Sequence, residues 1–442
     1  MSIKQQKPTT KKIIIQNRLF FRYYPAFQYI LKWLCISLAI GVCVGTASAG
    51  FLQSLDWVTN FRESHLWLVA LLPIGGLAIG LLYYYYGKDV EAGNNLLIDE
   101  IHHPQKTIPF RMAPFVYIGT MATHFFGGSA GREGTALQMA GAIADQFSKP
   151  LKLDENERKV LLMAAIAAGF GSVFGTPLAG AIFGMEVALI GRIKYDAIFP
   201  VFASAIIADL VTKLWHTHHT HYHIPVVPEM GFLNIAYAII AGIAFGLCAA
   251  AFSKTIYQIS SIFKAKIAFP PFRPLVGGVI VALAVFAPFL WNGGGEPTKY
   301  IGLGIPTIIQ SFDQQLPAYG FALKMAFTII TLASGFKGGE VTPLFFIGAA
   351  LGNALGLFIP LPMGLLAGMG FVAVFAGATN TPLASTVMAM ELFDSSCGVY
   401  AAIACVVAYL LSGHNSIYRR QGIGQPKHSR FAADEGKRLA EL

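Results

Sequence analysis

The chain has 442 residues, of which 55% are hydrophobic and only 12% are charged, whereas soluble domains average about 25% charged residues. This composition excludes an ordinary soluble protein and predicts an all-α protein that crosses a membrane several times. The formal net charge of +9 does not indicate nucleic-acid binding, because the basic residues cluster beside apolar segments as the positive-inside rule describes.

Basic residues gather in three stretches that flank apolar segments. They are Lys4, Lys7, Lys11, Lys12, Arg18 and Arg22 near the start, Lys254, Lys264, Lys266 and Arg273 in the middle, and Arg419, Arg420, Lys427, Arg430, Lys437 and Arg438 in the tail. Because cytoplasmic loops of membrane proteins are rich in Lys and Arg, both termini are predicted to be cytoplasmic. No short apolar region with a small-residue cleavage site follows the first basic run closely, so no cleaved signal peptide is predicted.

Apolar segments of roughly spanning length recur along the chain. In order they cover residues 31–52, 66–86, 110–128, 161–191, 198–214, 232–252, 275–291, 321–334, 344–359, 363–378, 381–393 and 399–412. A simple transmembrane helix needs about 20 apolar residues, and several of these segments are too short or too rich in Gly and Pro. Broken helices at membrane depth are tolerated only beside protein or a watery cavity, which is typical of a transporter core.

The most informative stretch reads GREGT at residues 131–135 and lies in a run of small and apolar residues. It places Glu133 where an apolar helix is expected to begin. An ionisable group at membrane depth costs about 2.5–3.5 kcal/mol on insertion scales and indicates a transport site. The flanking glycines let backbone N–H groups turn toward a ligand, and helix N-termini attract anions. We therefore predict an anion site with Glu133 as its titratable gate.

An internal repeat organises the chain. The tetrapeptide TPLA occurs at residues 176–179 and 381–384, and each copy is followed at the same distance by Met and a glutamate, Glu186 or Glu391. Upstream of the two copies, Glu133 and Glu340 lie at similar distances. Repeats of this kind usually have inverted topology and place the substrate at their interface.

The repeat predicts five parts of the chain. Residues 1–30 form a basic cytoplasmic segment, 31–215 the first transmembrane half, 216–229 a His-rich linker, 230–413 the second transmembrane half, and 414–442 a cytoplasmic tail.

These motifs resemble those of the CLC family of anion channels and transporters. The GREG stretch is similar to the family's GREGP, residues 174–186 resemble FNAPLAGILFIIE, GGEVTP at 338–343 stands in the place of GGIFAP, and Tyr418 matches the tyrosine after the last span. The resemblance implies a CLC-like inverted repeat of broken and tilted helices, and a homodimer with one pore per subunit. It also implies that Glu133 gates that pore.

Four departures from the chloride-type motifs make the chain similar to a bacterial branch of this family that exchanges fluoride for protons. Asn94 replaces the central serine of GSGIP, Thr135 replaces the proline of GREGP, Val187 stands where a second proton-carrying glutamate is expected, and Glu340 is an added acid. The resemblance implies proton-coupled fluoride export across the bacterial inner membrane, with the anion, protons and the lipid bilayer as partners.

Fluoride is small and strongly hydrated, so its site must supply short, strong hydrogen-bond donors. The predicted anion-binding residues are Asn94, Gly131, Arg132, Gly134, Thr135, Val341, Thr342 and Tyr418. Glu133 and Glu340 are predicted to couple protons to the anion. An ionised Glu133 would repel an anion at low dielectric, and Glu340 is our candidate for the carboxyl that Val187 lacks.

Plainer roles remain open for several of these residues. Glu340 could cap a helix or pair with Lys337, and Asn94 could bond the backbone within a turn. Tyr418 could be an interfacial anchor. We interpret Glu186 and Glu391 as structural.

Two other functions also remain open. A chloride-selective CLC transporter or a passive chloride channel would keep the gate, and the channel would lose proton coupling. A metal-responsive transporter is the second alternative, because neutral imidazoles at such spacing can bind zinc or copper; the weak candidates are His216, His218, His219, His221 and His223. No Cys joins them, so no metal site is predicted. No cofactor is predicted either, and no GxSxG, P-loop or HExxH motif indicates an enzyme.

Overall fold

The computed structural model describes the backbone of residues 10–287 and 296–442, and the side chains of these ranges from residue 23 onward. The predicted basic side chains before residue 23 therefore lie outside the described residues, as does the end of the apolar segment 275–291. Within the described part the protein is helical apart from two strands of two residues each. The prediction of an all-α membrane protein is confirmed.

The first half of the chain consists mainly of α-helices joined by short 3₁₀ turns. In order its elements are α1 (Thr10–Ser64), η1 (Leu66–Leu71), α2 (Leu72–Tyr86), η2 (Lys88–Val90), α3 (Asn94–His102), α4 (Met112–Phe125), α5 (Glu133–Ala144), η3 (Asp145–Phe147), α6 (Glu155–Phe174), α7 (Pro177–Glu186), β1 (Leu189–Ile190), η4 (Tyr195–Ala197) and α8 (Ile198–Leu214).

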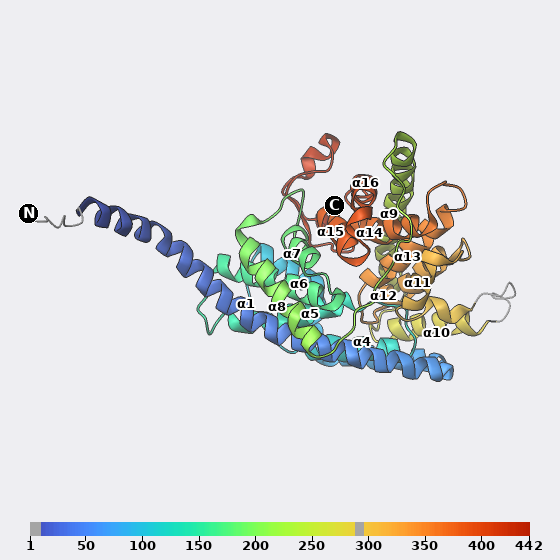
Figure 1. Ribbon diagram of the computed structural model, residues 1–442. Helices are drawn as coiled ribbons and strands as arrows, with labels where there is room; N and C mark the ends of the chain where they lie inside the picture. Colours follow the sequence, from blue (N-terminus) through green and yellow to red (C-terminus); the bar gives the residue numbers. More distant parts are fainter. Residues whose placement is uncertain (1–9, 288–295) are drawn as a thin grey trace, which may run out of the picture.

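The second half and the tail continue in the same style. Their elements are α9 (Phe232–Lys266), α10 (Phe272–Phe286), η6 (Pro297–Tyr300), α11 (Ile305–Asp313), α12 (Gly320–Ser334), α13 (Val341–Leu355), α14 (Met363–Thr379), α15 (Pro382–Leu392), η7 (Ser395–Cys397), α16 (Gly398–Leu411), β2 (Gly422–Ile423), η8 (Ser429–Asp434) and η9 (Leu439–Glu441). Figure 1 shows α5 to α8 on the left of the bundle and α9 to α16 towards the right, while α1 runs beneath both.

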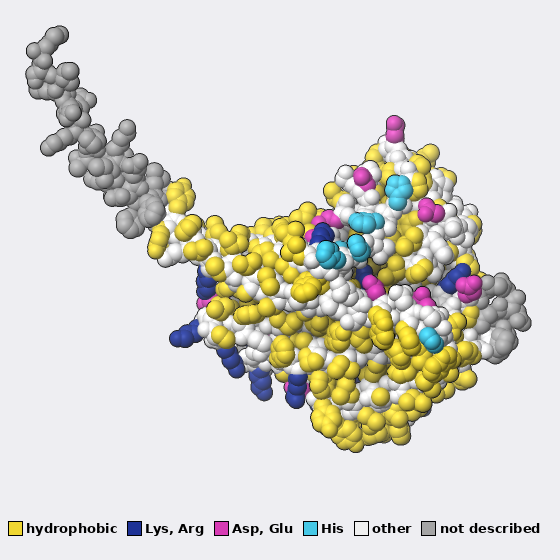
Figure 2. Space-filling model, turned by 60° about the horizontal axis from the view of Figure 1, so that its bottom comes forward, with side chains coloured by type: hydrophobic (Ala, Val, Ile, Leu, Met, Phe, Trp, Pro, Cys, Tyr) yellow, Lys and Arg dark blue, Asp and Glu magenta, His cyan; other side chains and the backbone are white. Residues whose placement is uncertain are grey.

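Four stretches of described helix are long and apolar enough to cross a membrane. They are Tyr23–Ser64, Leu66–Tyr86, Tyr195–Leu214 and Phe232–Lys266. Figure 2 shows hydrophobic side chains over most of the visible face, as a membrane-spanning surface requires. The shorter helices, among them α5 and α13, lie in the interior, where nearly all of their residues are buried. Their backbone ends are thus covered by protein, as broken helices at membrane depth require.

Two predicted segments differ from the structure. Residues 161–191 do not form one continuous span, because Gly175 takes a left-handed conformation with φ 72° and ends α6, after which Pro177 starts α7. Glycine ends helices in this way because it has no Cβ to oppose a positive φ, and proline suits the first helical position. The first helix begins at Thr10, well before the expected residue 31, and continues through Pro25.

Aromatic side chains join the two halves. Phe170 of α6 stacks on Phe375 of α14, with 6.0 Å between ring centroids, and Phe174 packs against Phe345 of α13 at 5.2 Å. Phe183 of α7 reaches Phe375 at 5.9 Å. Aromatic pairs at these separations add stability beyond the apolar area they bury, so this contact fixes the two halves against each other.

The repeated TPLA helices α7 and α15 are capped reciprocally across the halves. The Glu391 carboxylate accepts hydrogen bonds from the N–H groups of Leu178 (3.0 Å) and Ala179 (2.8 Å) in α7. Glu186 does the same at α15, where Leu383 (3.2 Å) and Ala384 (2.9 Å) donate. Carboxylates stabilise helix N-termini through the dipole and the free N–H groups, so both glutamates have structural contacts.

The tail folds back onto α3. Strand β2 pairs in parallel with β1, and Arg420 and Arg438 both contact the carboxylate of Asp99, at 3.3 and 2.9 Å. The Arg420 N–H also donates to the side-chain oxygen of Asn95 at 3.2 Å. These contacts hold the short helix that begins at Asn94, although nothing in its length or hydropathy would make it a stable span.

We expect Glu391→Ala to lower the free energy of unfolding by about 1–3 kcal/mol, because two N–H groups in the first turn of α7 lose a charged acceptor. Thermal unfolding of the purified protein measures this effect. Glu229→Ala is the matched control, since Glu229 is exposed. Equal transition temperatures for the two variants would contradict the capping role.

Candidate functional site

The two motif loops of the repeat halves pair with each other at the centre of the molecule. Gly131 and Gly339 form an antiparallel bridge, in which the Gly131 N–H donates to the Gly339 carbonyl at 2.6 Å and the Gly339 N–H donates back at 2.8 Å. Helices α5 and α13 begin directly after these loops. The bridge therefore brings the N-termini of two helices from opposite halves together.

Glycine is required in this bridge because the backbones approach closely. A Cβ on Gly339 would lie 2.7 Å from the backbone nitrogen of Gly134. A Cβ on Gly134 would lie 3.0 Å from both the side-chain nitrogen of Asn94 and the Cα of Gly339. The amide of Asn94 is thus in contact with the paired loops, so three of the sequence motifs meet at one place.

Glu133 is fully buried, and its carboxylate is bonded across the loop pair. It accepts hydrogen bonds from the backbone N–H of Thr342 at 3.0 Å and from the hydroxyl of Thr342. The Arg132 N–H donates to it at 3.1 Å, and the Arg132 guanidinium lies 3.5 Å away. A first-half carboxylate therefore occupies the donors at the start of a second-half helix, where donors and dipole both favour negative charge.

A cavity of about 190 Å³ lies beside the paired loops, and Asn94, Glu340 and Tyr418 line it. The side-chain oxygen of Asn94 and the hydroxyl of Tyr418 are buried and have no hydrogen-bond partner among the described residues. Buried polar groups without a partner are costly and call for an explanation such as an ion or a water molecule. The cavity thus offers amide and hydroxyl groups to a small polar ligand.

The predicted anion-binding residues fall into separate groups. Gly131, Arg132, Gly134, Val341 and Thr342 surround the Glu133 carboxylate or form its loops. Asn94 and Tyr418 line the neighbouring cavity. Thr135 follows Gly134 in α5, but its hydroxyl is hydrogen-bonded to that of Thr120 at 2.7 Å.

Glu340 occupies the N-cap position of α13, yet its side chain makes no capping hydrogen bond. It lines the cavity with Asn94 and Tyr418. Lys337 is not its partner within the described chain, because the Lys337 ammonium lies over the ring of Tyr83, 4.0 Å from the centroid. Glu340 thus stands at the N-terminus of α13 without a capping hydrogen bond, and within the described chain it forms no ion pair with Lys337.

Three further cavity residues were missed by sequence reasoning. Gln138, Glu91 and Lys337 also line the cavity, and a Cβ on Gly93 would lie 3.2 Å from the amide of Gln138. A lone amide within the apolar helix α5 was a usable signal for Gln138. No local pattern indicates Glu91 or Lys337, because they reach the cavity only through tertiary packing.

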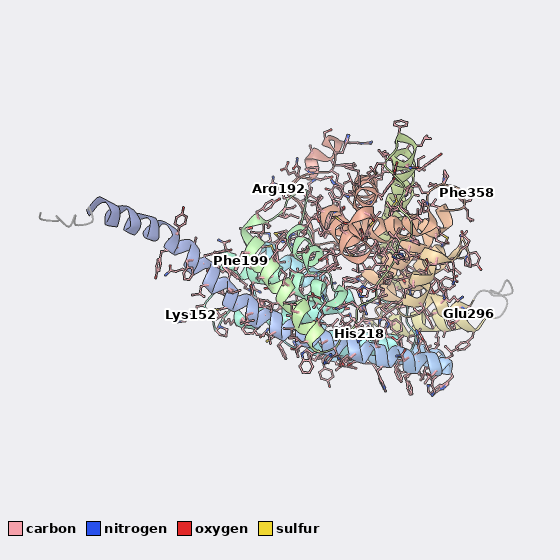
Figure 3. All side chains as sticks on the ribbon, viewed as in Figure 1. Lys152, Arg192, Phe199, His218, Glu296 and Phe358 are labelled. Atoms are coloured by element: carbon pink, nitrogen blue, oxygen red, sulfur yellow. The ribbon has the colours of Figure 1, made fainter. Side chains whose placement is uncertain are left out.

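The His-rich segment follows α8 on another part of the molecule. His218, His219 and His221 line a cavity of about 420 Å³ with Lys213 and Glu391, and Figure 3 labels His218. His216 and His223 are not among its lining residues. Among the described residues, no three His, Cys, Asp or Glu side chains are placed to hold a metal ion.

The chain is similar to known membrane proteins over most of its length. A family model described as voltage gated chloride channel matches residues 75–413. A chloride/fluoride channel protein of Pseudomonas syringae pv. tomato is 52% identical over 407 residues, which is 92% of this chain and 90% of the relative. The chain belongs to the voltage-gated chloride channel family, called CLC. This family consists of membrane channels and transporters.

Solved structures agree with the CLC assignment. The crystal structure of a CLC-type fluoride/proton antiporter matches with a TM-score of 0.84 and 34% identity, covering 88% of this chain and 98% of that one. A slow cyanobacterial Cl⁻/H⁺ antiporter shares the fold at a TM-score of 0.73 and 20% identity, with 86% and 94% covered. The predicted resemblance to the CLC family, most like its fluoride/proton antiporter subclass, is confirmed.

We expect Gly339→Ala to separate the two motif loops of this CLC protein, because the added methyl group meets backbone atoms of Gly134. The free energy of unfolding should fall by about 1–3 kcal/mol, and anion efflux from liposomes should be lost. Gly50→Ala is the control, since a Cβ at Gly50 meets no atom within 4 Å. If the two variants have equal stability and equal flux, the close approach does not matter.

Proposed function

We propose that this protein exports fluoride in exchange for protons, with Glu133 as the gate of the anion path. The observation that carries the proposal is the position of the Glu133 carboxylate on the N–H and hydroxyl groups of Thr342. These donors suit an anion as well as they suit a carboxylate. A fluoride ion can occupy them only when Glu133 leaves.

Glu133 and the anion compete for these donors, so binding of the anion is linked to protonation of Glu133. While Glu133 is ionised, it satisfies the Thr342 donors and repels a second negative charge. Once protonated, it accepts hydrogen bonds less well and no longer repels the anion, so fluoride can take its place. The return of ionised Glu133 then expels the fluoride. Each cycle therefore moves a proton and an anion in opposite directions.

The neighbouring cavity supports fluoride as the anion. The amide of Asn94 and the hydroxyl of Tyr418 both line this cavity, and the Tyr418 hydroxyl is a donor without a partner in the described structure. A small, strongly hydrated anion needs such donors when it loses water. The same cavity contains the Glu340 side chain, which lacks a capping bond. We propose that Glu340 exchanges protons with this cavity, because Val187 at the alternative position has no group that can carry a proton.

The names of two similar proteins support this proposal. The Pseudomonas relative is called a chloride/fluoride channel protein, and the structural neighbour is called a CLC-type fluoride/proton antiporter. We further propose a homodimer in the bacterial inner membrane with both termini cytoplasmic. Exposed apolar side chains along α8 and α16, among them Ile206, Leu210, Val406 and Leu410, are available to a second copy or to lipid.

A chloride-selective transporter or passive channel is the competing function, because the donors around Glu133 do not by themselves select an anion. Liposomes loaded with fluoride or chloride separate the two anions when efflux and external pH are followed together. Fluoride efflux with proton uptake supports the proposal. Faster chloride efflux, or fluoride efflux without proton movement, contradicts it.

We expect Glu133→Gln to reduce coupled proton uptake at least about tenfold, which corresponds to a barrier increase of about 1.4 kcal/mol. The amide keeps the shape of the carboxyl group but cannot release a proton. Proton flux is measured with a pH electrode during fluoride efflux. Glu229→Gln, which changes an exposed acid, is the control. Normal proton flux in Glu133→Gln would remove Glu133 as the gate.

We expect Glu340→Gln to lower proton uptake at least about tenfold while the transition temperature changes little, because its side chain makes no capping bond. A capping role predicts the reverse, a loss of about 1 kcal/mol of stability with coupling intact. Both quantities are measured on the same preparation. Lowered stability with an unchanged ratio of protons to fluoride would assign Glu340 to the helix terminus.

A further inference from the structure

A second polar cavity lies between the C-terminal half of α9 and the chain that follows α16. Its volume is about 420 Å³, which is within the range of small-molecule sites. Its lining includes Lys254, Arg419, Ser253, Ser261, Asn415 and Ser416. In Figure 1 the end of the chain lies beside α9 and α16 at this place.

Two cations, Lys254 and Arg419, line this cavity, and Leu442, the last residue of the sequence, lines it as well. No described Asp or Glu side chain is among its lining residues, and neither Lys254 nor Arg419 is in an ion pair with a described acidic side chain. The Arg419 guanidinium stacks over the ring of Tyr257, 4.8 Å from the centroid, so the ring fixes this cation at the wall. Such stacking leaves the guanidinium N–H groups free to bind an anion.

Neutral groups add unused hydrogen-bonding capacity. The hydroxyl of Ser253 is buried, with the residue 1% exposed, and has no partner within the described structure. His414 also lines the cavity; burial lowers the pKa of its ring, and its Nδ1 lies 3.5 Å from the carboxylate of Asp434. Asp434 itself pairs with Lys437 at 3.3 Å and is in no ion pair with Lys254 or Arg419 within the described structure.

We propose that this cavity binds a phosphate group and that the bound group adjusts transport through Tyr418. Guanidinium, ammonium, hydroxyl and amide donors around one space are the groups that bind phosphate oxygens. A phosphate group neutralises Lys254 and Arg419 and accepts from the Ser253 hydroxyl. Free phosphate and an anionic lipid headgroup share this chemistry.

The connection to Tyr418 is short. The Tyr257 hydroxyl donates to the carbonyl of Ile417, and the hydroxyl oxygen of Ser416 accepts from the Tyr418 N–H at 3.0 Å. Both Tyr257 and Ser416 line the phosphate cavity, whereas Ile417 and Tyr418 line the cavity that contains Asn94. A ligand that fixes Tyr257 and Ser416 therefore restrains Ile417 and Tyr418.

Two measurements test this site on the purified full chain. Transition temperature is followed as inorganic phosphate is added at constant ionic strength, with chloride as the balancing salt, and fluoride efflux is followed in the same series. The wild type should show a saturable rise of a few degrees, since a ligand that binds the folded state raises its stability, and a saturable change in efflux rate.

The double variant Lys254→Gln/Arg419→Gln should lose both effects, and Lys266→Gln/Lys149→Gln, with the same charge change outside the cavity, should keep them. Tyr257→Phe should keep the stability effect and lose the effect on efflux.

If phosphate has no effect but vesicles containing phosphatidic acid stabilise the wild type and not the double variant, the phosphate belongs to a lipid headgroup. Equal responses in the wild type and the double variant, or no response to either source, overturn the proposal. The stability measurement does not require transport, so its result is independent of the fluoride/proton function.

Discussion

The structure depends on the antiparallel bridge between Gly131 and Gly339. Two backbone hydrogen bonds at the centre of the molecule hold the loops of opposite repeat halves in register, and each loop leads directly into a helix. The donors at the start of α13 then face the carboxylate of Glu133 at the start of α5. Helix dipoles from both halves favour negative charge at this point, and the same donors can serve a carboxylate or an anion.

The rest of the fold holds the two loops in place and keeps the site buried, where the dielectric constant is low. The phenylalanine contacts between α6, α7, α13 and α14 join the halves, and Glu186 and Glu391 each bond the first turn of a helix in the opposite half. Salt bridges from the tail to Asp99 hold α3 in place. Broken helices without such cover would leave N–H groups unpaired in the membrane. The site at the helix ends therefore depends on these contacts.

Two cations near Tyr418 lie over aromatic rings. Lys337 lies over Tyr83 beside the cavity of Asn94, and Arg419 lies over Tyr257 beside the proposed phosphate cavity. In both cases an aromatic ring holds a cation at a cavity wall. Stacked cations remain available to anions. Each of the two cavities beside Tyr418 therefore has a cation at its wall that can attract an anion.

The sequence alone determined the membrane class, the internal repeat and the position of Glu133, because hydropathy, repeated motifs and an acid among small residues are local signals. It also grouped Asn94, Thr342 and Tyr418 through their resemblance to family motifs. Only the tertiary structure decided that Thr135 bonds Thr120, that Glu340 lacks a capping bond, and that Gln138, Glu91 and Lys337 line the cavity. Only the structure showed that the predicted segment 161–191 is interrupted at Gly175. These outcomes depend on which side chains from distant segments meet, and hydrogen-bond partners across the two halves leave no periodic pattern in the chain.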